Sequence, residues 1–201
     1  MSLSGRLFYI AVLSTAPSLV YAHTPVEGVG NFYNGLLHPV LVAAQLLSLI
    51  VVGLLFGQQG RKSIRLTLPA FLVALIIGLG IVAFDVTFNA EITLLVISVI
   101  IGILVALALH LPQPMNLFLA IALGIILGLD SPQEELWGVS KFYALVGTFL
   151  GAMLCIAFTT SLALFLNRSW QRILVRILGS WGAASAFMVL ATFCWWFQPC
   201  A

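Results

Sequence analysis

The hydrophobic positions of this chain form long runs separated by short polar segments. Beyond the first 22 residues we predict six hydrophobic helices, which cover residues 36–57, 66–84, 92–111, 115–130, 138–166 and 174–198. Runs such as 66–84 and 92–111 carry no charge over about 20 positions, the length that a helix needs to cross a bilayer. Because backbone groups in lipid must be hydrogen-bonded within their own segment, the pattern predicts an all-α, polytopic membrane protein.

Composition supports this fold class. The chain has 201 residues, 62% of them hydrophobic and 7% charged, and its mean hydropathy is +1.18. A soluble domain has roughly a quarter of its residues charged. We therefore expect this chain to be surrounded by the lipid bilayer. The net charge of +2 is too small to indicate a nucleic-acid surface.

The first 22 residues have the pattern of a secretory signal peptide. Arg6 precedes an apolar stretch over 7–20, and Ala22 offers a small residue before His23. Cleavage there would leave residues 23–201 as a single six-helix transmembrane domain. The alternative is an uncleaved first helix, which would give seven helices in all.

Charge predicts the orientation. Six of the eight positive residues gather in two connections, and they are Arg61, Lys62, Arg65, Arg168, Arg172 and Arg176. Of the other two, Arg6 agrees with the orientation below and Lys141 does not. The positive-inside rule places both connections in the cytoplasm. We therefore expect a bacterial-type inner (plasma) membrane protein, with the N-terminus of the mature chain and the C-terminus outside, in the periplasm.

Small residues recur at the spacing that lets helices approach closely in lipid. The pairs are Gly53 and Gly57, Gly124 and Gly128, and Gly147 and Gly151. We interpret them as helix-packing positions rather than functional ones.

His38 and Gln45 are the polar residues of the first predicted helix. In one continuous helix they would lie about 10 Å apart on nearly the same face, with Pro39 at the first helical position. His38 is either a metal ligand or an interfacial histidine that hydrogen-bonds a neighbouring helix. Gln45 is a poor ligand for a transition metal, and its amide serves either a transport path or helix packing.

The other candidate ligands lie on the predicted outer side. His23, Glu27 and Asp130 would join His38 there to hold nickel or another divalent transition metal, for which imidazole and carboxylate are suitable donors. For Asp130 the alternative is a solvated loop acid. The chain contains no HxxxH or HExxH motif and no CxxC pair.

The segment from His23 to Gly57 resembles the start of the HupE/UreJ family, membrane proteins associated with nickel supply to hydrogenase and urease. The matching residues are His23, Phe32, Gly35, His38, Pro39, Val52 and Gly53. A second family motif resembles LGIILGLDSP, where Gly124, Gly128, Asp130 and Pro132 match. The resemblance implies the six-helix fold and a metal cargo.

The chain departs from both family motifs at ligand positions. The Asp-His pair of the first motif falls on Ala44 and Gln45, and the glycine before it falls on Val42. Both histidines of the second motif are replaced, by Leu123 and Leu127.

Two functions follow. The first is metal-cation uptake or delivery, most specifically of nickel. The second is a non-transporting accessory or structural subunit, or an assembly factor, of a larger membrane enzyme complex. The expected partners are the lipid bilayer and either a membrane protein complex or further copies of this chain. Enzyme activity is not expected, because the chain has no nucleophile–base pair or phosphate loop.

Overall fold

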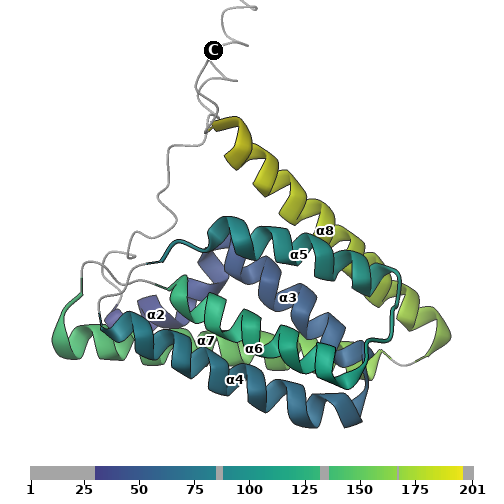
Figure 1. Ribbon diagram of the computed structural model, residues 1–201, viewed down its shortest axis with the longest axis horizontal. Coiled ribbons are helices and arrows are strands. Elements are labelled where there is room, and N and C mark those ends of the chain that lie inside the picture. Colours follow the sequence, from purple (N-terminus) through teal and green to yellow (C-terminus); the bar gives the residue numbers. More distant parts are fainter. Residues whose placement is uncertain (1–29, 85–87, 132–135, 167, 197–201) are drawn as a thin grey trace, which may run out of the picture.

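The computed structural model describes residues 30–84, 88–131, 136–166 and 168–196; the predicted signal peptide, 1–22, lies outside them. Within these ranges every regular element is an α-helix (Figure 1). The helices are α2 (Asn31–Leu41), α3 (Ala43–Gln58), α4 (Arg61–Ala83), α5 (Glu91–Ala106), α6 (Gln113–Leu129), α7 (Gly138–Phe165) and α8 (Ser169–Trp196).

The first predicted helix is broken in two. α2 and α3 meet at Val42 with a bend of 68°, so the prediction of one continuous helix over 36–57 is wrong. Pro39 lies near the end of α2 and not at its first position. Proline offers no N–H to the preceding turn, and the β-branched Val42 adopts an extended conformation with φ −83° and ψ 110°. The chain therefore changes direction between His38 and Gln45.

α5 ends five residues before the predicted boundary at 111. The N–H of Leu109 bonds to the carbonyl of Leu104, and the N–H of Ala108 bonds to that of Val105. This is the Schellman arrangement, in which the residue after the C-cap is left-handed, and Ala108 has φ 54°. The helix therefore ends at this Schellman arrangement inside a hydrophobic run, where no glycine or proline in the sequence marks the end.

The helices have the composition of a membrane-embedded protein. By length and hydropathy, α4, α7 and residues 170–193 of α8 can cross a membrane, as can α2 and α3 taken together. α5 and α6 are apolar but shorter, with 16 and 17 residues. Large side chains on the outer faces are apolar, including Val73, Ile77 and Phe158, which are more than half exposed. Such faces suit contact with lipid.

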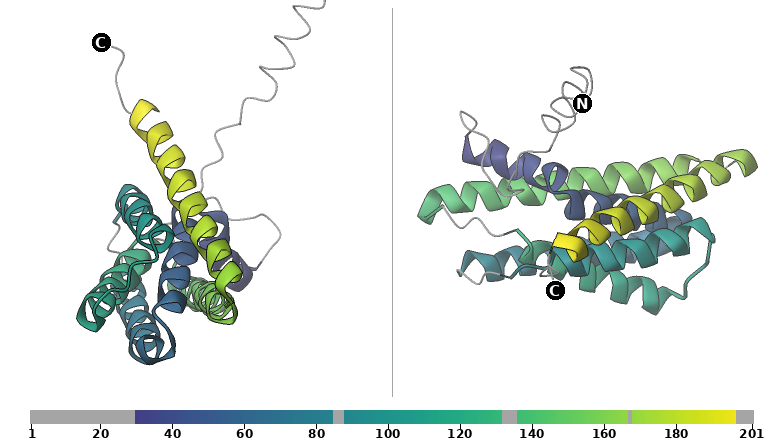
Figure 2. Two further views of the ribbon diagram at one scale, coloured as in Figure 1. Left: turned by 90° about the vertical axis from the view of Figure 1, so that its right-hand side faces the viewer. Right: turned by 90° about the horizontal axis from the view of Figure 1, so that it is seen from above.

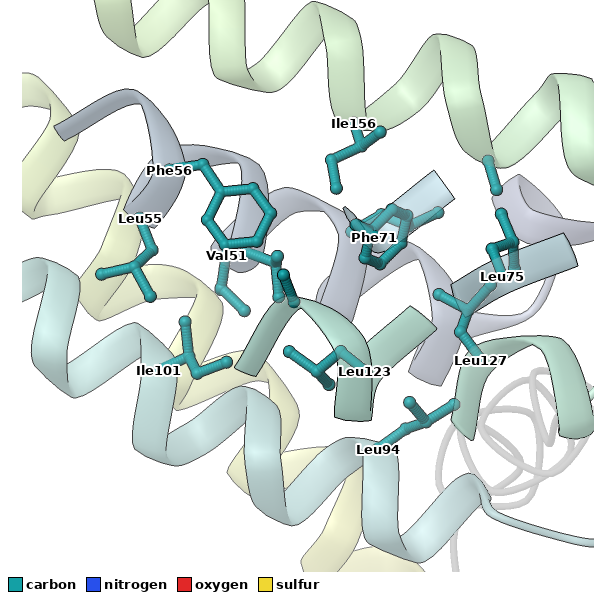
Figure 3. Packing of buried hydrophobic residues seen from close by; sticks show 14 of the residues in the cluster. Val51, Leu55, Phe56, Phe71, Leu75, Leu94, Ile101, Leu123, Leu127 and Ile156 are labelled. Carbon is teal, nitrogen blue, oxygen red and sulfur yellow. The ribbon is translucent and has the colours of Figure 1, made fainter. Parts of the chain in front are cut away.

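α3 occupies the centre of the bundle. It packs against α2, α4, α5, α7 and α8, and the remaining large contacts join α4 to α6, α2 to α7 and α5 to α8. The end-on view of Figure 2 shows these helices arranged around α3, and Figure 1 shows α8 crossing α5 obliquely. In Figure 3, Val51, Leu55 and Phe56 of α3 lie between Ile156 of α7 and Ile101 of α5. All five side chains are at most 1% exposed.

The three predicted glycine pairs lie at close helix contacts, which confirms their packing role. Gly53 and Gly57 face α7, Gly124 and Gly128 face α4, and Gly147 and Gly151 face α2. At Gly147 a Cβ atom would overlap the carbonyl oxygen of Phe32 and lie 2.8 Å from the backbone nitrogen of Leu36. Both neighbours are backbone atoms, so they cannot move away by rotation of a side chain.

We predict that Gly147→Ala lowers the free energy of unfolding by about 1–3 kcal/mol, because α2 must move away from α7. Gly80→Ala is the matched control, since a Cβ there meets no atom within 4 Å and alanine favours helix by up to about 1 kcal/mol. Thermal unfolding in mild detergent, followed by circular dichroism, measures both. Equal melting temperatures would contradict the contact.

Candidate functional site

Three polar side chains from the sequence analysis meet at one end of the bundle. Gln45 lies in the first turn of α3, and His38 lies in α2, on the other side of the break. Asp130 follows α6 as its C-cap residue. The exposed fraction is 0% for Gln45, 2% for Asp130 and 9% for His38. Asp130 is therefore not the solvated loop acid that one interpretation expected.

The side-chain nitrogen of Gln45 faces four hydrogen-bond acceptors. It lies 2.7 Å from the backbone oxygen of Asp130 and 3.2 Å from Oδ2 of the same residue. Ser131 Oγ and His38 Nε2 are each 3.4 Å away. An amide NH2 has only two protons, so it cannot bond strongly to all four atoms. We call these four atoms the acceptor ring.

Of the two more distant atoms of the ring, Ser131 Oγ faces the amide as an acceptor, and His38 Nε2 does so in one of its two tautomers. Ser131 donates its single hydroxyl proton to the carbonyl of Leu127, at 2.9 Å, so its oxygen can only accept from Gln45. The Gln45 nitrogen donates, and a bond to His38 Nε2 therefore requires the imidazole proton on Nδ1. An unprotonated imidazole nitrogen is the form that coordinates metal ions.

The carboxylate of Asp130 is held between two helix ends of opposite polarity. Its Oδ1 accepts a 2.8 Å hydrogen bond from the N–H of Ala90, the N-cap residue of α5. A helix N-terminus carries partial positive charge and stabilises a carboxylate. Asp130 also ends α6, where the carbonyl groups carry partial negative charge. A cation placed beside Oδ2 would be attracted both by the carboxylate and by the end of α6.

The carbonyl oxygen of the Gln45 side chain is buried and has no hydrogen-bond partner among the described residues. Leaving such a group unpaired costs about 1–3 kcal/mol. Rotation of the amide would bring this oxygen to the ring and remove the NH2 group. Without a cation that rotation would place a fifth acceptor against the other four; with a cation in the ring, the oxygen would face a positive charge instead.

The structure brings together two of the four predicted metal ligands. His38 and Asp130 both contact the Gln45 amide. The other two, His23 and Glu27, lie outside the described residues. Over the described ranges, no three His, Cys, Asp or Glu side chains gather in a position to hold one metal ion. The other two atoms of the acceptor ring are the backbone oxygen of Asp130 and the hydroxyl oxygen of Ser131.

Two members of the site were not predicted. Ser131 supplies the hydroxyl of the ring, and Ala90 holds the Asp130 carboxylate through its backbone N–H. No pattern in the sequence identifies Ala90, because the bond uses only its main chain. Ser131 could have been found from its place directly after Asp130, at the end of a predicted helix.

Beneath the ring the bundle is mostly hydrocarbon. Leu123 and Leu127, which stand where the second motif has histidines, are each 1% exposed. In Figure 3 they lie in the core, with Leu127 near Leu75 of α4 and Leu94 of α5. No imidazole occupies these two positions, so any continuation of the site into the bundle must use other groups.

A hydroxyl pair lies one turn below Gln45. Ser48 Oγ of α3 and Ser98 Oγ of α5 are 2.7 Å apart. Each hydroxyl is also 2.7 Å from a carbonyl oxygen of its own helix, that of Ala44 or that of Leu94. One of the two hydroxyl protons therefore forms the hydrogen bond between Ser48 and Ser98, and the other is donated to a carbonyl oxygen. The bond between the two hydroxyls joins α3 to α5.

Comparison with known proteins gives one match. The family model described as HupE / UreJ protein matches residues 10–189, which include α2 to α7 and most of α8. No curated protein and no solved structure matches the chain significantly. The match covers nearly the whole chain, including the residues of the acceptor ring. The chain therefore belongs to the HupE/UreJ family.

Proposed function

We propose that this protein supplies a divalent metal cation, nickel in the first place, and that the acceptor ring captures the ion. One observation carries the proposal: four acceptor atoms lie within 3.4 Å of a single point, the position of Gln45 Nε2. The amide NH2 group has partial positive charge, so it acts as an internal substitute for a cation. Membership of the HupE/UreJ family favours nickel as the cargo.

The chemistry of the ring suits a transition-metal ion. His38 offers an imidazole nitrogen and Asp130 a carboxylate oxygen, both common ligands of such ions. Bonds from these atoms to a metal are about 2.0–2.2 Å long, so the ring must contract as the amide leaves. The side-chain oxygen of Gln45 can then turn inward as a further, weak ligand.

The arginine-rich connections support an orientation in which the ring faces outward. Arg61 and Arg172 line one common pocket, at the end of the bundle remote from Asp130. By the positive-inside rule this end faces the cytoplasm, in a bacterial-type inner membrane. The ring then lies in the outer half of the membrane, on the side of the periplasm.

A second function is supported by the leucines beneath the ring. Leu123 and Leu127 fill the core where a chain of ligands would otherwise continue, which favours an accessory subunit that does not transport. We expect such a subunit to copurify with a membrane partner in stoichiometric amount from mild detergent. A lone, monodisperse protein that binds nickel would exclude this function and favour the first one.

We predict that His38→Ala and Asp130→Asn each weaken nickel binding at least about tenfold, the lower end of the cost of losing even a supporting residue at a metal site. His110→Ala is the matched control, because this histidine is exposed and lies at the opposite end of the bundle. Isothermal titration of the purified proteins with Ni(II), Zn(II) and Cu(II) measures the affinities.

Nickel accumulation by intact cells tests the transport step with the same three variants. We expect uptake to fall with His38→Ala and Asp130→Asn and to stay unchanged with His110→Ala. A functional nickel transporter serves as positive control. Uptake that does not differ between cells with and without the protein would exclude transport.

Gln45→Leu should separate the contribution of the amide to stability from its role as a substitute for the cation. The variant removes the donor from the ring, and we predict a stability loss of about 1 kcal/mol without metal. Ni(II) should then raise the melting temperature of Gln45→Leu more than that of the parent, because the ion replaces the lost positive group.

Gln59→Leu is the control for this variant. Gln59 also joins two segments, through bonds to the Leu109 carbonyl and the Leu111 N–H, but it lies at the other end of the bundle. We expect Gln59→Leu to lower stability and to leave the nickel-induced shift at the parent value. The same shift in both glutamine variants would refute a metal site at the ring.

A further inference from the structure

A pocket of about 520 Å³ opens at the end of the bundle remote from the acceptor ring. It lies between the last turns of α3 and α7, the first turns of α4 and α8, and the connection from α5 to α6. Its ionisable lining residues are Arg61 of α4, Arg172 and Arg176 of α8, and His110 of the connection. Gln58 lines it as well. Three guanidinium groups from two helices thus border one cavity.

The described lining of this pocket contains no carboxylate. The acidic residues of the whole chain are Glu27, Asp85, Glu91, Asp130, Glu134 and Glu135. Glu91 and Asp130 lie at the far end of the bundle, and a helix the length of α4, with 23 residues, spans roughly 35 Å. At that distance neither Glu91 nor Asp130 can form an ion pair with the arginines of the pocket.

Local bonds position the polar groups around the cavity. Nε of Arg176 donates a 2.7 Å hydrogen bond to the carbonyl of Ala106, the last residue of α5. This bond fixes one edge of the guanidinium group. Gln58 donates from Nε2 to the carbonyl of Val105, at 3.1 Å, while its Oε1 is buried without a partner among the described residues.

We propose that this pocket binds a phosphate group, either that of an anionic phospholipid headgroup or free phosphate. Arginine side chains present paired N–H donors that match the tetrahedral oxygens of phosphate. Basic pockets between helices at the cytoplasmic surface are typical sites for lipid headgroups. The site differs from the acceptor ring in charge, position and ligand, and it does not depend on metal supply.

The source of the phosphate decides how binding is measured. For free phosphate, isothermal titration with inorganic phosphate is performed on the whole chain in a neutral detergent. For a lipid, the protein is reconstituted in vesicles of phosphatidylcholine with or without phosphatidylglycerol. Native mass spectrometry after extraction then counts the retained phosphatidylglycerol molecules.

Arg61→Gln and Arg172→Gln test the pocket from two helices. We expect each to weaken binding roughly fivefold, the effect of one basic residue near an anionic group. Arg65→Gln is the matched control, because it removes the same charge from an exposed position of α4 that does not line the pocket. Circular dichroism confirms folding, and either pocket variant suffices if the other does not fold.

The outcomes separate the two sources. Loss in the titration identifies free phosphate as the ligand, and loss of retained phosphatidylglycerol alone identifies the lipid; both support the site. Equal binding by the parent, the pocket variants and Arg65→Gln would overturn the proposal. A parent protein that binds neither inorganic phosphate nor phosphatidylglycerol would overturn it as well.

Discussion

The amide of Gln45 connects three parts of the chain that are distant in sequence. It belongs to α3, the helix on which the bundle is assembled, and it contacts His38 of α2 and Asp130 at the end of α6. A buried NH2 group needs hydrogen-bond acceptors within the protein, and that of Gln45 finds them here. The break at Val42, the position of α6 and the capping of α5 all meet this requirement at one place.

The helices were largely predictable from sequence, because long apolar runs dominate the pattern. The break at Val42 was not, since Pro39 also fits the first position of a single helix and the hydrophobic run of 36–57 continues across the break. For the same reason the sequence placed His38 and Gln45 in one helix, whereas they lie in α2 and α3 on either side of the break, with their Nε2 atoms 3.4 Å apart. Composition predicts where helices form, but not where contacts between them redirect the chain.

The candidate site was predictable only in part. His38 and Asp130 were found as ligand types on the same side of the membrane, and the structure places both at Gln45. Ser131 and the N–H of Ala90 were missed, because one is a common loop residue and the other acts through its backbone. The sequence left two roles open for Gln45, one in a transport path and one in helix packing. Its position in the acceptor ring is compatible with both.

The glycine contacts bear on how such a chain can diverge. Gly35 and Gly147 touch the backbone of the neighbouring helix, so a larger side chain there displaces a whole element. Leucines such as Leu127 occupy ordinary side-chain volumes in the core, where residues of similar size exchange at small cost. The close approach of the helices therefore rests on backbone contacts at the glycines, so a change of side chain at Leu123 or Leu127 leaves the atoms of these contacts in place.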